Sequence, residues 1–150
     1  MWSSFHASVG AAIVLAIPDP VVGLGLAFLS HFVVDYIGET GYKSLKEAAF
    51  AEGNLLAIYI TAASLGDFWL LMGAWVMANL PDLIDKPRRL IWGKEEWFSC
   101  HNGKGLFQSF GKKLGYPVLC RLTYTQTVVL NIVSTLIFVA IMLATHYLNQ

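Results

Sequence analysis

Ionisable side chains stand inside strongly apolar sequence in this chain, at His6, His31, Asp35, Asp82 and Asp85. A charge near the centre of a bilayer costs at least about 2.5 to 3.5 kcal/mol on insertion scales, so apolar membrane helices rarely carry such groups. His and Asp side chains at helical spacings are the ligands that a divalent metal ion uses. The pattern therefore predicts helices that enclose these groups, and a metal site that offsets the cost of burying them.

The composition indicates an integral membrane protein. Of the 150 residues, 56% are hydrophobic and 13% are charged, whereas an average soluble domain carries about 25% charged residues. The length allows a single domain over residues 1–150. Two cysteines are too few for a disulfide framework. We expect membrane lipids as partners, and no nucleic acid.

The apolar runs predict an all-α, membrane-embedded bundle of five helices. Turn residues at Pro18-Asp19-Pro20 and Gly66-Asp67 separate neighbouring runs, and each Asp is expected to cap the helix that follows. Small residues recur along the first, second and fourth runs, which lets helices approach closely in lipid. The predicted helices cover residues 2–17, 20–38, 46–64, a fourth run that follows Asp67 and reaches Leu80, and 122–148.

A rival division joins residues 46–80 into one kinked helix and gives four spans. The positive charges favour five spans, because all ten Lys and Arg lie at Lys43, Lys46 and between Lys86 and Arg121. Five spans place both segments on one side of the membrane, which the positive-inside rule assigns to the cytoplasm together with the N-terminus. The first run is short for a bilayer, so tilt or partial insertion remains open.

This topology brings six candidate metal ligands to one membrane depth, five at cytoplasmic helix ends and one in the cytoplasmic loop. His31 and Asp35 are spaced i, i+4 and share a helix face, and Asp82 and Asp85, spaced i, i+3, can do the same. The mixture of imidazole and carboxylate favours zinc, with manganese or iron as alternatives, over calcium. The six residues are His6, His31, Asp35, Asp82, Asp85 and His101.

Several of these residues also have a purely structural interpretation. A lone His in an apolar segment more often packs between helices or lies at the interface than binds a metal, and Asp82 after Pro81 also fits a helix end. Glu39, one turn beyond Asp35, stays open as a further ligand. In the predicted loop at 86–121, Lys and Arg alternate with Trp and Phe, which fits either an anionic membrane surface or simple interface anchoring.

At these motifs the chain resembles the membrane-bound metal-dependent hydrolase family. The resemblance rests on GLAFLSHFVVD at 25–35, NLPDLID at 79–85, His6 followed by Gly10, and Cys-His-Asn at 100–102, within residues 1–105. It implies a small protein of the bacterial inner membrane, distantly related to zinc-dependent phospholipase C enzymes. The chain departs from the family in three ways. One extra residue separates Asp82 from Asp85, and Lys86 stands where a His would follow. The Pro-Asp segment also follows the Ser-His helix, whereas it precedes that helix in the best-known branch of the family.

Together, motifs and resemblance predict a metal-dependent hydrolase that acts on a lipid headgroup or a lipid-linked phosphoester at the cytoplasmic face. His6, His31, Asp35 and one of Asp82 or Asp85 would hold the metal, and the remaining carboxylate would act as general base. His101 would complete the coordination or protonate a leaving group. Two other classes stay open: a structural or partner-binding membrane protein with polar groups as glue, and a small ion or metal transporter subunit.

Overall fold

The structure, a computed structural model, describes residues 3–35, 37–38, 45–93 and 120–148. Within these residues the chain forms five helices, which confirms the all-α prediction, and two strands of two residues each that were not predicted. The strands β1 (Ile37–Gly38) and β2 (Cys120–Arg121) pair in parallel. The helices are α1 (Ser3–Ala16), α2 (Pro20–Val34), α3 (Leu45–Ala63), α4 (Phe68–Leu90) and α6 (Tyr124–Leu148).

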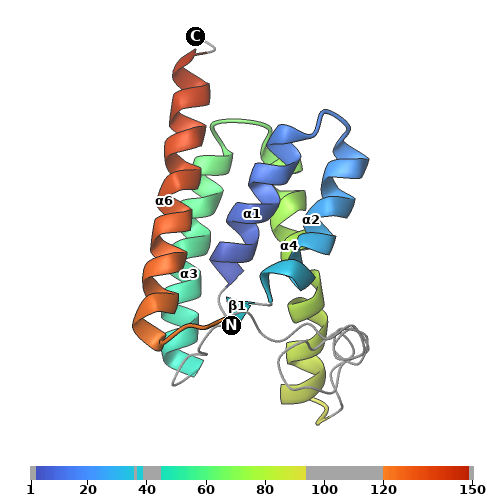
Figure 1. Ribbon diagram of the computed structural model, residues 1–150, viewed down its shortest axis with the longest axis vertical. Coiled ribbons are helices and arrows are strands. Elements are labelled where there is room, and N and C mark those ends of the chain that lie inside the picture. The colour runs from blue at the N-terminus through green and yellow to red at the C-terminus, as the bar shows by residue number, and fades with distance from the viewer. Residues whose placement is uncertain (1–2, 36, 39–44, 94–119, 149–150) are drawn as a thin grey trace.

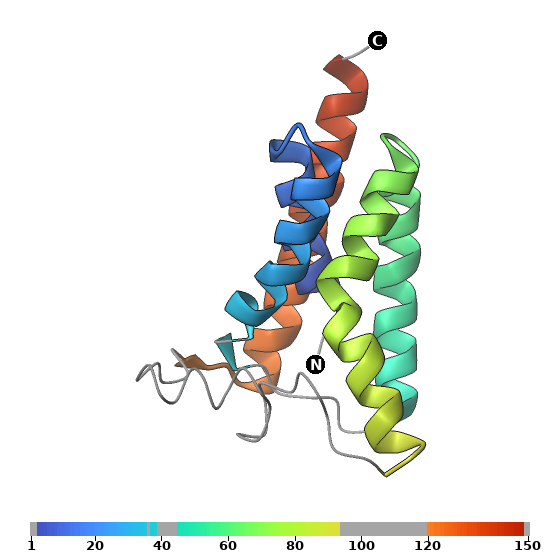
Figure 2. The same cartoon turned by 90° about the vertical axis from the view of Figure 1, so that its right-hand side faces the viewer.

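The helices run up and down in chain order (Figure 1). The turn between α1 and α2 and the turn between α3 and α4 lie at one end of the bundle, with the end of α6. The start of α1 and the end of α2 lie at the other end. Because α3 ends at Ala63 and α4 begins at Phe68, the single kinked helix over residues 46–80 is wrong. Figure 2 shows α3 and α4 beside each other, on one side of α1, α2 and α6.

Asp19 and Asp67 cap helices as predicted. The backbone N–H groups of Val21 and Val22 donate to Asp19 Oδ1 at 2.8 and 3.0 Å. The N–H of Leu70 donates to Asp67 Oδ1 at 3.0 Å. A side-chain acceptor at this position satisfies N–H groups that lack an intrahelical partner, and so it fixes where α2 and α4 begin.

The fourth helix is longer than predicted. We expected it to end at Leu80, before Pro81, but α4 continues to Leu90, so residues 86–90 of the predicted loop are helical. Proline lacks the N–H that a helix interior uses, which is why the sequence predicts an end there. A buried stripe formed by Ala74, Ala78, Asp82 and Asp85 continues past Pro81, and this packing outweighs the hydrogen bonds that Pro81 and Pro87 of α4 cannot donate.

Helix α1 is the centre of the bundle and contacts the other four helices. Its approach to α4 depends on Gly10, because a Cβ there would lie 2.8 Å from Ala78 Cβ and 3.1 Å from Ala74 O. Ala7 and Ala11 of α1 are fully buried beside it. The predicted close approach of helices at small residues is therefore confirmed for α1 and α4.

The outer surface of the bundle is strongly apolar. One of the described helices, α6, is long and apolar enough to cross a membrane, while α1, α2 and residues 49–63 of α3 are apolar but shorter. Soluble proteins rarely expose large contiguous apolar patches. On α6 the exposed apolar side chains include Val129, Ile132, Val133, Leu136 and Ile137.

Candidate metal centre

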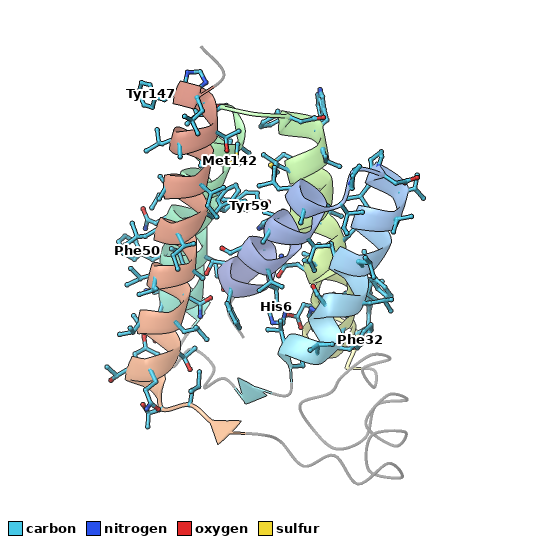
Figure 3. The ribbon with its side chains drawn as sticks, turned by 45° about the horizontal axis from the view of Figure 1, so that its top comes forward. His6, Phe32, Phe50, Tyr59, Met142 and Tyr147 are labelled. Carbon is cyan, nitrogen blue, oxygen red and sulfur yellow. The ribbon has the colours of Figure 1, made fainter. Side chains whose placement is uncertain are left out.

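Three predicted ligands from two helices meet inside the bundle, near the start of α1 and the end of α2 (Figure 3). His6 stands in the first turns of α1, His31 in the last turn of α2, and Asp35 is the C-cap residue of α2. The exposed fractions of these residues are only 1%, 2% and 8%. The predicted convergence of His6 with the His31–Asp35 pair is thus present in the structure.

The distances within this group fit a single metal ion. Asp35 bridges the two imidazoles, with Oδ1 3.5 Å from His6 Nε2 and Oδ2 3.3 Å from His31 Nε2. The two rings stack with their centroids 4.4 Å apart. Two ligand atoms on one tetrahedral zinc ion lie about 3.3 Å apart, given bonds near 2.0 Å. One nitrogen or oxygen of each residue lies within 4.8 Å of the other two, so the group can hold a metal ion.

The backbone of α4 sets the orientation of His31. His31 Nδ1 lies 2.7 Å from the carbonyl oxygen of Ala78. A carbonyl only accepts hydrogen bonds, so Nδ1 carries the proton and the Nε2 lone pair of a neutral imidazole faces the Asp35 carboxylate. Two acceptors at that distance repel each other unless a cation or a proton lies between them. A hydrogen bond from the far nitrogen to a backbone carbonyl is also typical of metal-binding histidines.

The other predicted site residues are not part of this group. Asp82 and Asp85 are buried on α4, and Asp82 is near enough to act electrostatically on His31, but neither belongs to the three-residue cluster. His101 and Glu39 lie outside the described residues.

Two contributors to the site escaped the sequence analysis. The first is the Ala78 carbonyl, which no side-chain pattern reveals. The second is Asn131 of α6, whose Oδ1 accepts hydrogen bonds from Ser4 Oγ at 2.7 Å and from the Phe5 N–H at 2.9 Å, in the turn that carries His6. An amide side chain in the longest apolar run was the available signal for Asn131.

Comparisons of the chain with protein-family models, with curated proteins and with solved structures found no match. The structure contributes a buried His-His-Asp group that can hold a metal ion, and the identity of that ion is inferred from ligand chemistry alone.

Proposed function

We propose that the protein is a membrane-embedded, metal-dependent hydrolase that cleaves a lipid headgroup ester or a lipid-linked phosphoester at the cytoplasmic face. The observation that carries the proposal is the buried group of His6, His31 and Asp35, with its imidazole-to-carboxylate distances of 3.3 and 3.5 Å. Buried ionisable groups are retained only where partners or a metal compensate their desolvation. The motifs that resemble the membrane-bound metal-dependent hydrolases, at 25–35 and 79–85, supply the reaction class.

The exposed tryptophans of α4 support insertion of the bundle in a membrane. Trp69 is 81% exposed near the start of α4 and Trp92 is 61% exposed just after its end. At 1.5 Å per residue they lie about 34 Å apart, close to the roughly 30 Å of a hydrocarbon core. Trp is enriched at both interfaces of membrane proteins. The carboxylates of Asp82 and Asp85 are buried within the bundle, as charged groups in membrane helices require.

The position of the cluster supports a substrate at the lipid headgroups. The turn of α1 that carries His6 contacts Asn131, which lies about 10 Å along α6 from its start at Tyr124. Every Lys and Arg belongs to residues 43–46 or 86–121, which lie in or beside the connections from α2 to α3 and from α4 to α6. Because those helix ends lie at the same end of the bundle as the cluster, the positive-inside rule favours a cytoplasmic site.

The chemistry divides among the chain's own residues. His6, His31 and Asp35 would hold the ion, which supplies Lewis acidity toward a phosphoryl oxygen and activates water at neutral pH. Asp82, which acts electrostatically on His31, is the candidate general base. His101 is proposed from the sequence as the proton donor to the leaving group. The burial of the three residues lowers the local dielectric constant and strengthens each of these interactions.

Elemental analysis and melting of the full chain in detergent test this function. We expect bound zinc, manganese or iron, and a lower melting temperature after treatment with a strong chelator. A protein that neither contains metal nor responds to the chelator would contradict the metal site, and would leave a structural membrane protein whose buried polar groups only join helices.

Hydrolysis of phospholipid vesicles tests the reaction class. Asp82→Asn is expected to keep the metal and lose hydrolysis. The matched control is Asp19→Asn, which removes a carboxylate at the opposite end while keeping a good N-cap residue, and it should keep both properties. Equal activity in the two variants would exclude Asp82 as the general base.

A further inference from the structure

Asn131 joins the last helix of the chain to the turn that carries His6. We propose that Asn131 is a positioning residue of the metal centre, which holds the start of α1 so that the His6 imidazole reaches Asp35 and His31. The proposal rests on the proposed metal-dependent function. It adds a residue that acts through the backbone of α1, because the hydrogen-bond partners of the Asn131 side chain are Ser4, Phe5 and Thr127 and not His6, His31 or Asp35.

The Asn131 side chain is fully buried and its hydrogen bonds point in two directions. Oδ1 accepts from the Ser4 hydroxyl at 2.7 Å and from the Phe5 N–H at 2.9 Å. Nδ2 donates to the Thr127 carbonyl at 2.8 Å, within α6 itself. The amide is therefore fixed by its own helix and presents its oxygen to α1.

The Phe5 N–H is a group that α1 cannot satisfy by itself. Helix α1 begins at Ser3, and the first four N–H groups of a helix have no intrahelical acceptor. Water normally serves them, but in the bilayer core an unsatisfied N–H is costly. Asn131 therefore does for α1 what Asp19 does for α2, except that the capping side chain comes from another helix.

The first turn of α1, which Asn131 holds in place, determines the position of His6. His6 directly follows Phe5, and its ring stacks on His31 while its Nε2 lies 3.5 Å from Asp35 Oδ1. Metal coordination tolerates deviations of only about 0.2 Å, so fraying of the first turn would withdraw this ligand. Farther along, an apolar groove lined by Val9, Ala12, Ile137 and Ile141 separates α1 from α6. The hydrogen bonds to Asn131 therefore join α1 to α6 at the turn that carries His6.

Cobalt(II) affinity, measured by its absorption spectrum in competition with a chelator, tests the proposal on the full chain in detergent. Asn131→Leu removes the acceptor at similar volume and should weaken cobalt binding about 10-fold, the lower end of the effect of losing a group that hydrogen-bonds a ligand directly. In Asn131→Asp the buried carboxyl is expected to be protonated, so it keeps an acceptor for α1 and a donor for the Thr127 carbonyl and should restore most of the affinity. The control is Thr135→Val, because the Thr135 hydroxyl donates to the Asn131 backbone carbonyl within α6. It should bind cobalt as the native protein does.

Amide hydrogen exchange over residues 4–6 provides a readout that needs no metal. Exchange should accelerate in Asn131→Leu and stay at the native rate in Thr135→Val. Native cobalt affinity in Asn131→Leu, or unchanged exchange, would overturn the positioning role. Failure of the native protein to bind cobalt would instead remove the proposed function, and the metal role of Asn131 with it.

Discussion

Helix α1 has two buried polar faces that differ in kind. Toward α6, Ser4 and the Phe5 N–H meet Asn131, and the groups are neutral and joined by hydrogen bonds of 2.7 and 2.9 Å. Toward α2, His6 meets His31 and Asp35, where imidazole nitrogens face a carboxylate at 3.3 to 3.5 Å. Both faces are excluded from solvent, but only the second requires a cation or a proton to compensate its charge.

The difference separates polar groups that join helices from polar groups that bind a ligand. Hydroxyl and amide groups can satisfy each other completely, so the α6 face is stable as it stands. The His31 Nδ1 contact with the Ala78 carbonyl leaves Nε2 directed at the carboxylate, so the α2 face requires a cation or a proton, and its three residues can hold a metal ion. A change on the α2 face should therefore alter the protein's response to metal, and a change on the α6 face should alter mainly its stability.

The largest effect is expected from Asp35→Asn. The amide keeps the shape of the carboxylate but loses its charge, and we expect metal affinity to fall at least about 100-fold, beyond the effect of losing an outer-shell partner. In the presence of chelator the variant should melt close to the native protein, because the amide nitrogen can donate to an imidazole lone pair. Titration with zinc and melting in detergent measure both, with Asp67→Asn as the control. Native metal content in Asp35→Asn would contradict the view that the α2 face, unlike the α6 face, binds a metal ion through its charge.

An intermediate effect is expected from Gly10→Ala. The new Cβ would lie 2.8 Å from Ala78 Cβ and 3.1 Å from Ala74 O, and such overpacking costs about 1 to 3 kcal/mol, partly offset by about 1 kcal/mol of helix propensity. We expect a net loss of stability, and weaker metal binding because the Ala78 carbonyl moves away from His31. In the control Gly25→Ala the added Cβ has no neighbour within 4 Å, so melting should stay the same or rise. Equal melting of the two variants would refute the close approach of α1 and α4.

The smallest effect is expected from Ser4→Ala on the α6 face. This change removes one hydrogen bond to Asn131 Oδ1, which keeps the bond from the Phe5 N–H. Buried hydrogen bonds between membrane helices contribute about 0.6 kcal/mol on average. We expect a loss of this size in the free energy of unfolding, equal with and without chelator. A loss that disappears when metal is removed would show that the Ser4 bond, and not only the Phe5 N–H bond, positions His6 for metal binding.

Local sequence patterns predicted the parts of the fold that depend on neighbours in the chain. The caps at Asp19 and Asp67 follow from side chains that bond N–H groups two and three residues ahead. The pairing of His31 with Asp35 follows from helical spacing. Helix order then placed His6 beside them, because it fixes which helix ends lie together.

The sequence failed where distant packing decides the outcome. Pro81 predicted a helix end, but α4 continues to Leu90 because its buried stripe packs on other helices. Asn131 pairs with Phe5 across 126 positions, a distance over which no periodicity in a single sequence carries information. The Ala78 carbonyl that contacts His31 is a backbone group. Every residue type has one, so the sequence could not single it out.

The bond between Asn131 and the start of α1 joins the first and last helices to be synthesised, so the candidate metal centre can be completed only when synthesis reaches the last helix. The ribosome delivers the His6 turn first and its cap 126 residues later, which takes roughly 6 to 25 seconds at about 5 to 20 residues per second. During that interval α1 and α2 already contain His6, His31 and Asp35, but the first turn of α1 lacks its acceptor. If Asn131 positions His6 as proposed, ordered metal loading waits for the last helix, and a chain truncated before α6 would carry His6, His31 and Asp35 without holding the ion in place.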